Sequence, residues 1–154
     1  MGFFRLLIAP PRPSALTDMP ATVNRFLCRK GYTAITLFGQ LFTREEASAE
    51  RLNRKYDALK NHEMIHLRQA QDTGNSWYLF YLRYMWYSLL ALRFFRKQRN
   101  AAYYLNPFEI EAYGHMFDLH YLERTGGKAS EWRKFAKMSL AARLRYIRKN
   151  NIGL

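Results

Sequence analysis

Residues 62–66 read His-Glu-Met-Ile-His, and this spacing constrains the fold more than any other feature of the chain. Positions i and i+4 of an α-helix lie on one face, so His62 and His66 can reach one tetrahedral zinc ion together. Glu63 lies about 100° further round the helix. There its carboxylate can act as general base on a zinc-bound water and later protonate the leaving amine of a peptide. The motif therefore requires a helix at this point and a second element that supplies a third ligand.

The context of the motif favours a metal site over coincidence. Average residue usage produces the HExxH pattern by chance in about one in a few hundred chains of this length. Here the pattern lies inside a predicted helix, with Leu59 one turn before His62 and Ala70 one turn after His66. A strand predicted upstream can pair with an extended substrate. We therefore expect one bound Zn²⁺ ion.

The remaining patterns predict a mostly helical α+β fold with a small sheet or edge strand and four or five helices. Residues 31–42 are rich in β-branched and aromatic side chains and predict a strand, with a bend at Gly39. Residues 43–46 form a capping-box pattern that opens a helix. This helix is expected to run, with a break near Asn53, to Asp72. The other expected elements are helices at 76–98, 106–124 and 130–149, the last capped by Ser130, with an irregular arm over 1–20 and one domain over 21–154.

The third ligand is expected from the helix that begins at Asn106, because both histidines outside the motif lie there. A helical wheel directs Glu109 toward the apolar side and Glu111 toward water, and it leaves His115 at the border. Glu109 and His120 share the inward face but lie roughly 16 Å apart along the axis, so they cannot bind one metal. We predict Glu109 as the ligand, with Glu111 or His115 as the alternatives. A plain capping-box role is also open to Glu109, and His120 is expected to be a core histidine.

The motif, followed by a glutamate on a later helix, resembles the gluzincin group of zinc metallopeptidases. Residues 108–112, Phe-Glu-Ile-Glu-Ala, also resemble the E-x-x-A-D segment of the CAAX-prenyl-protease and heat-shock-membrane-protease family, whose first Glu is the third zinc ligand. The layout is also similar to small uncharacterised bacterial domains with an HExxH…PFExEA pattern. The resemblance implies a minimal zincin-like domain in which His62, His66 and Glu109 hold zinc. Tyr113 stands where that family has an Asp, so the resemblance implies that its hydroxyl orients a ligand histidine.

The charge of the chain favours an anionic partner. Twenty-five Lys and Arg against twelve Asp and Glu give a formal net charge of +13. The helix expected at 130–149 has Glu131 as its only acid and carries seven cations: Arg133, Lys134, Lys137, Arg143, Arg145, Arg148 and Lys149. A solvated face on a packed helix is the plainer interpretation, and contact with an anionic membrane or nucleic acid is the functional one. A single cysteine, Cys28, excludes an internal disulfide and indicates a reducing, cytoplasmic compartment.

The helix expected at 76–98 is aromatic almost all round, which is typical of a buried core helix. Contact with a membrane interface is the second interpretation. A membrane span is the least favoured, because Arg83 lies near the middle and a central arginine costs roughly 2.5–3.5 kcal/mol on insertion. The apolar stretch is also shorter than the roughly 20 residues that a span requires.

Together these features predict a zinc-dependent metallopeptidase that hydrolyses a peptide or protein substrate, with Glu63 as general base. The strand within 32–42 would align an extended substrate by β-augmentation, and Tyr103 and Tyr104 are candidates for stabilising the oxyanion. The alternative is a non-catalytic basic binding module with a vestigial or structural motif. A third hypothesis is a DNA-associated metalloprotease whose positive surface recruits the substrate.

Overall fold

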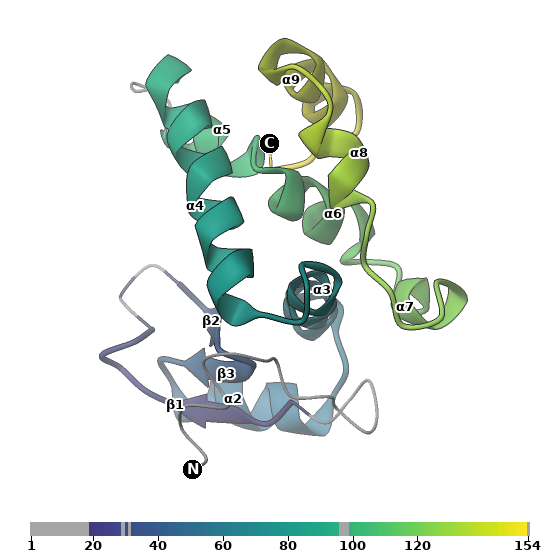
Figure 1. The fold of residues 1–154 in the computed structure, drawn as a ribbon. Helices are drawn as coiled ribbons and strands as arrows, with labels where there is room; N and C mark the ends of the chain where they lie inside the picture. The colour runs from purple at the N-terminus through teal and green to yellow at the C-terminus, as the bar shows by residue number, and fades with distance from the viewer. Residues whose placement is uncertain (1–18, 29, 31, 96–98, 154) are drawn as a thin grey trace.

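The computed structural model describes residues 19–28, 30, 32–95 and 99–153. The irregular arm expected over 1–20 lies outside this part, except for its last two residues. The described chain contains a three-stranded sheet and eight helices, so the expectation of a mostly helical α+β fold is confirmed (Figure 1). The helices outnumber the four or five expected because several predicted helices are interrupted and one short helix was not predicted.

The region expected as one bent strand is a hairpin. Strands β2 (Ala34–Leu37) and β3 (Gln40–Thr43) pair antiparallel, and β1 (Ala21–Val23) pairs parallel with β3, which gives the order β1-β3-β2. The two turn residues, Phe38 and Gly39, both have positive φ, as tight two-residue hairpins require. The Phe38 ring packs edge-on against Trp77 and Tyr81, and its N–H donates to Tyr81 Oη at 3.0 Å. These contacts hold a bulky residue in an unfavourable conformation.

The predicted capping box at 43–46 is wrong. Thr43 is the last residue of β3, and its hydroxyl donates to the Glu45 carbonyl instead of capping a helix. Helix α2 (Glu46–Arg54) follows without a side-chain cap. Helix α2 ends at Arg54, so the predicted break near Asn53 falls just after that residue. The side-chain amide of Asn53 hydrogen-bonds the N–H and the C=O of Ala21 in β1.

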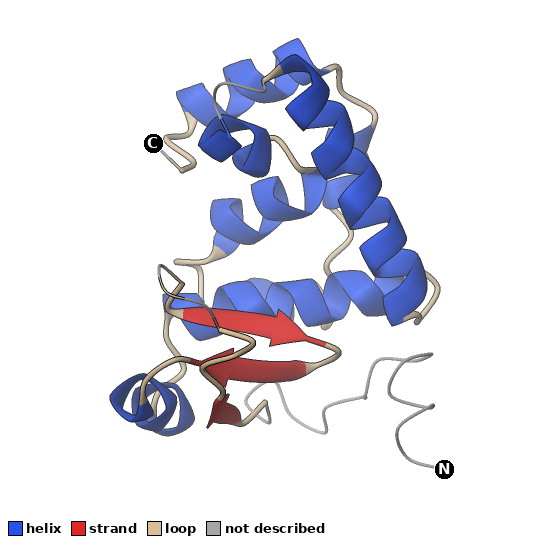
Figure 2. Ribbon diagram, turned by 90° about the vertical axis from the view of Figure 1, so that its left-hand side faces the viewer, coloured by secondary structure: helices blue, strands red, loops and turns tan. Residues whose placement is uncertain are grey.

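Helix α3 (Ala58–Asp72) carries the HExxH motif. Asp57 caps it by accepting from the Lys60 N–H at 3.0 Å, and Thr73 ends it as expected. In Figure 2 this helix runs beside the sheet, α2 lies below it with the strands, and most of the later helices lie above it. Most of α3 is buried, so its motif lies between the sheet and the helical layer.

Helix α4 (Trp77–Phe94) is shorter than expected and is buried on one face only. Its inner face includes Trp77, Phe80 and Ala91, whereas a row of large apolar side chains on its outer face is exposed. The prediction of a core helix is therefore wrong for half of its surface. Of the helices that the structure describes, none has the length and apolarity needed to cross a bilayer. A short helix, α5 (Arg99–Tyr104), follows.

The helix expected at 106–124 begins as predicted but ends early. Asn106 caps α6 (Pro107–His115) by accepting from the Phe108 N–H, with Pro107 in the first turn. The side-chain amide of Asn61 in α3 then donates to the carbonyls that follow, those of His115, Met116 and Asp118, at 3.0–3.1 Å. These bonds end α6, and α7 (Tyr121–Arg124) starts separately.

The helix expected at 130–149 is also two helices, α8 (Trp132–Ala136) and α9 (Leu140–Lys149). Ser139, and not Ser130, supplies the side-chain cap, by accepting from the Ala142 N–H. Arg143 is buried and donates to the carbonyls of Leu105, Phe135 and Ala136. Arg143 is thus part of the core and does not belong to the exposed basic face predicted for this segment.

Candidate metal centre

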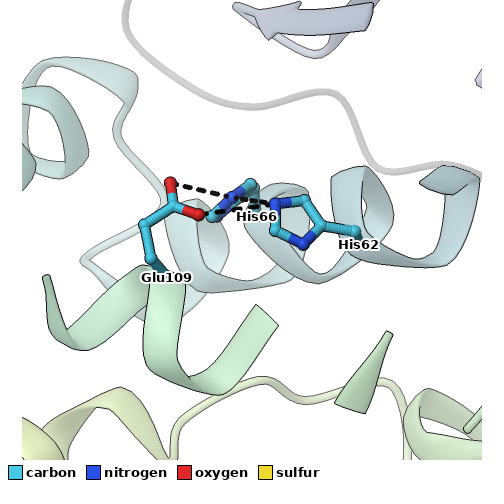
Figure 3. A group of neighbouring side chains, drawn as sticks. All are labelled: His62, His66 and Glu109. Atoms are coloured by element: carbon cyan, nitrogen blue, oxygen red, sulfur yellow. Dashed lines mark hydrogen bonds and ion pairs between the residues drawn. The ribbon is translucent and has the colours of Figure 1, made fainter. Parts of the chain in front are cut away.

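His62 and His66 lie side by side on the face of α3 that meets α6 (Figure 3). Their Nε2 atoms are 3.1 Å apart, and the ring planes are nearly perpendicular. Glu109, in the first turn of α6, points its carboxylate at both rings. His62 and Glu109 are buried, and the His66 side chain is only 12% exposed.

The spacing of the three donor atoms fits one small cation. Glu109 Oε2 lies 3.5 Å from His62 Nε2, and Oε1 lies 3.4 Å from His66 Nε2. Donor atoms about 2.05 Å from a tetrahedral zinc ion lie about 3.3 Å from one another. The Oε2 atom is buried and has no hydrogen-bond partner in the described part of the chain. This buried cluster can hold a metal ion, and its donors are the nitrogen and oxygen atoms that zinc accepts.

The pKa shifts of His66 and Glu109 also indicate that the cluster favours a bound positive charge. Burial lowers the pKa of His66, but the Glu109 carboxylate beside it outweighs burial and raises that pKa to about 9. Burial acts to raise the pKa of Glu109, yet the two imidazoles hold it well below its usual range. A cation bound between these side chains takes the place of the proton that they share.

A hydrogen-bond chain behind His66 fixes which of its nitrogens is free. Gln69 Nε2 donates to the Phe108 carbonyl and to Glu111 Oε2, at 3.0 and 2.9 Å. Because a carbonyl and a carboxylate only accept, the amide oxygen of Gln69 must face His66 Nδ1, which lies 2.8 Å away. In the neutral ring the proton is therefore on Nδ1, which leaves the Nε2 lone pair available to a metal ion.

Tyr84 holds the Glu109 carboxylate in place. Its hydroxyl donates to Glu109 Oε1 at 2.6 Å. Burial and the nearby Glu109 carboxylate raise the pKa of Tyr84 well above its ordinary value, so it stays a donor. Sequence reasoning missed both Gln69 and Tyr84. Gln69 lies three residues after His66 on the same helix, so a contact between the two side chains could have been predicted. Tyr84 lies on another helix, and nothing in the sequence predicted its contact with Glu109.

The alternative ligands lie elsewhere. Glu111, expected to face water, is fully buried, and its two oxygens accept from Gln69, Tyr121 and the N–H groups of 131 and 132. His115 stacks on Tyr121 and pairs with Glu131 at 2.8 Å. His120 is exposed and pairs with Glu123, so the prediction of a core histidine is wrong; it follows the end of α6 and does not share its inward face.

Comparison with known proteins gives no relative. No protein-family model matches the chain, and no curated protein or solved structure is similar enough to count as a match. The function must therefore be inferred from the site itself.

A cavity of about 400 Å³ opens onto the cluster. All four residues of β2 line one side, α4 lines the other, and His62, His66 and Glu109 lie between them. Glu63 also lines this cavity, and its carboxylate accepts no hydrogen bond from the described residues. Glu63 is thus the acidic group beside the cluster that can exchange a proton with a molecule in the cavity.

The three tyrosines singled out from the sequence lie on one side of the cluster. Tyr103 lines the cavity, and its ring packs edge-on against those of Tyr104 and Tyr113. The Tyr113 ring lies edge-on to His62, at 4.4 Å between centroids, but His62 Nδ1 has no partner among the described residues. The hydroxyl of Tyr113 therefore does not orient the histidine as its place in the sequence suggested. Tyr103 remains a candidate oxyanion donor, whereas Tyr104 lines only a second, adjoining cavity.

Proposed function

We propose that this protein is a zinc-dependent metallopeptidase. The observation that carries the proposal is the buried cluster of His62, His66 and Glu109 at zinc-ligand spacing, with Glu63 beside it on the wall of an open cavity. Zinc, when bound, supplies Lewis acidity toward a carbonyl and lowers the pKa of a coordinated water toward about 7. Two histidines, one carboxylate and an open position are typical of catalytic rather than structural zinc sites.

Glu63 is the proton carrier in this proposal. The residue is 7% exposed and lines the cavity, where its carboxylate can take a proton from water and return it to the leaving amine. Gln69 and Tyr84 keep the ligands oriented through His66 Nδ1 and Glu109 Oε1. Tyr103 supplies a hydroxyl toward the same cavity.

The substrate would lie along β2, which is one of the two edge strands of the described sheet and the one that lines the cavity. In a two-residue hairpin, Leu37 and Gln40 exchange backbone hydrogen bonds, and so does the pair of Ile35 and Phe42. Ala34 and Thr36 then turn their N–H and C=O groups to the open edge. An extended peptide that pairs with these two residues lies in the cavity beside the cluster.

The test uses hydrolysis itself as the readout. The zinc-loaded protein and its Glu63→Gln variant are incubated with an unfolded, alkylated protein in ¹⁸O-water, and new C-termini are identified by mass spectrometry. We expect labelled termini with the wild type and a loss of about 10²-fold or more in the variant, which should keep its zinc. Equal labelling by both proteins would refute the role of Glu63. Zinc binding without cleavage by either would favour the non-catalytic binding module.

A further inference from the structure

The outer face of α4 is a continuous apolar surface. Tyr78, Leu82, Met85, Trp86 and Leu89 are each more than half exposed, and they recur at intervals of three and four residues. This spacing places them on one side of the helix, about 120° round from the residues that line the cavity. Figure 1 shows α4 at the margin of the molecule, and the exposure of these side chains means that no described element covers them. We call these five residues the α4 stripe.

Lysine and arginine are the only charged residue types in the sequence segment that contains the α4 stripe. No Asp or Glu occurs from 73 to 108, whereas that segment contains five Lys and Arg residues. Arg83 and Arg93 are exposed on α4, and no described carboxylate lies within ion-pair distance of either. Helix α9, which packs beside the C-terminal half of α4, adds three exposed cations: Arg145, Arg148 and Lys149.

An exposed apolar stripe flanked by cations favours an anionic membrane surface as its partner. A second copy of the chain, placed stripe to stripe, would bring like charges together without a compensating acid, at a formal charge of +13 per chain. An anionic bilayer instead offers an apolar layer for leucine and methionine, and negative headgroups for the flanking arginines. Tyrosine and tryptophan, which form part of the α4 stripe, are the side chains most enriched at the membrane–water interface.

We propose that the α4 stripe docks on an anionic lipid surface, with α4 lying in the plane of the interface. The exposed apolar side chains enter the headgroup region, and Arg83, Arg93 and the α9 cations contact lipid phosphates. The inner face of the same helix stays packed against the core. Docking in this way requires no metal and is independent of the chemistry at Glu63.

The three tryptophans make the test selective. Trp77 and Trp132 are buried, whereas Trp86 is 60% exposed and lies in the α4 stripe. A change in the environment of α4 therefore appears mainly through Trp86. With vesicles of phosphatidylcholine and phosphatidylglycerol we expect a blue shift of the emission, protection from acrylamide and co-sedimentation. Vesicles of phosphatidylcholine alone, or high salt, should weaken all three. A Trp86→Phe variant should still co-sediment but lose the blue shift.

Charged variants show which surface binds. Leu82→Glu should weaken co-sedimentation about tenfold or more, because it removes apolar contact and adds repulsion. Phe117→Glu is the matched control, since Phe117 is even more exposed but lies in the turn after α6; it should bind like the wild type. Equal loss in both variants, or no binding by the wild type to anionic vesicles, would overturn the proposal. So would a lipid-free dimer in light scattering that Leu82→Glu dissociates, because the second copy would then be the occupant.

Discussion

Replacing Gln69 by Leu should loosen the metal site without removing a ligand. The substitution keeps a side chain of similar size but removes the acceptor 2.8 Å from His66 Nδ1. The imidazole then loses the group that fixes its tautomer and its rotation. Loss of such a partner typically weakens metal binding about 10- to 100-fold, which corresponds to about 1.4–2.7 kcal/mol. The cost of leaving one buried donor unpaired, about 1–3 kcal/mol, agrees with this range.

The assay is a competition between the protein and a zinc chelator, carried out at two pH values. The hydrogen bond from Gln69 also helps to raise the pKa of His66, to about 9. At neutral pH protons compete with zinc for His66. The variant binds the proton more weakly, which favours zinc, and orients the ring less well, which disfavours zinc, so the two effects partly cancel. The full loss should therefore appear about one pH unit above the pKa, where the wild-type ring is already neutral. The Co²⁺-loaded variant should also show an altered absorption spectrum, because the ligand field changes.

A matched control separates positioning from folding. Gln71, two residues further along α3, accepts a hydrogen bond from Arg68 and does not line the cavity. Gln71→Leu should keep the zinc affinity of the wild type. If Gln69→Leu lowers the melting temperature but binds zinc within about twofold of the wild type, measured well below that temperature, Gln69 is only structural. That result would refute the inference that the amide orients His66.

Three further outcomes are expected. His62→Ala should lose stoichiometric zinc in elemental analysis, and full retention would remove His62 from the ligand set. Glu109→Ala should do the same, whereas Glu111→Ala should keep zinc but lower the free energy of unfolding by roughly 3 kcal/mol, because several donors lose their acceptor; the opposite ranking would exchange the roles of the two acids. The chelator-treated protein should become less stable between about pH 6.5 and 9. The folded pKa of His66 lies above its ordinary 6.5, so the stabilisation is complete below that value and is lost as pH rises through about 9. Thermal melts across this range should show no such loss in zinc-loaded protein, where the cation replaces the proton.

The cluster of His62, His66 and Glu109 was predictable from sequence because it depends on short-range geometry. Two histidines four residues apart share a helical face wherever the helix packs, and Asn106-Pro107 fixes the start of α6 two residues before Glu109. The sheet, by contrast, was only partly predicted. Its hairpin turn at Phe38 depends on aromatic contacts with α4, which lies more than thirty residues further along the chain.

The predicted helix ends were wrong where side chains distant in sequence donate hydrogen bonds to the backbone carbonyls. Asn61 ends α6, and Arg143 takes the carbonyls at the end of α8; neither contact leaves a local signal. The early end of α6 also explains the error at Glu111. The helical wheel was oriented partly by residues 116–119, which do not belong to the helix, and the first six residues of α6 are buried on every side. There was therefore no water-facing side for Glu111 to occupy.

Hydrogen-bond saturation, and not burial, distinguishes the two acids of α6. Glu109 and Glu111 are 2% and 0% exposed and lie only two residues apart. Glu111 accepts from four donors, which compensate the charge on both of its oxygens. Glu109 accepts from Tyr84 alone, and its second oxygen faces His62 without a hydrogen bond from any described residue. A buried carboxylate with one uncompensated oxygen needs a cation. Two imidazoles beside it provide the remaining ligands for a metal, so Glu109 completes the site while Glu111 holds the helices that carry it.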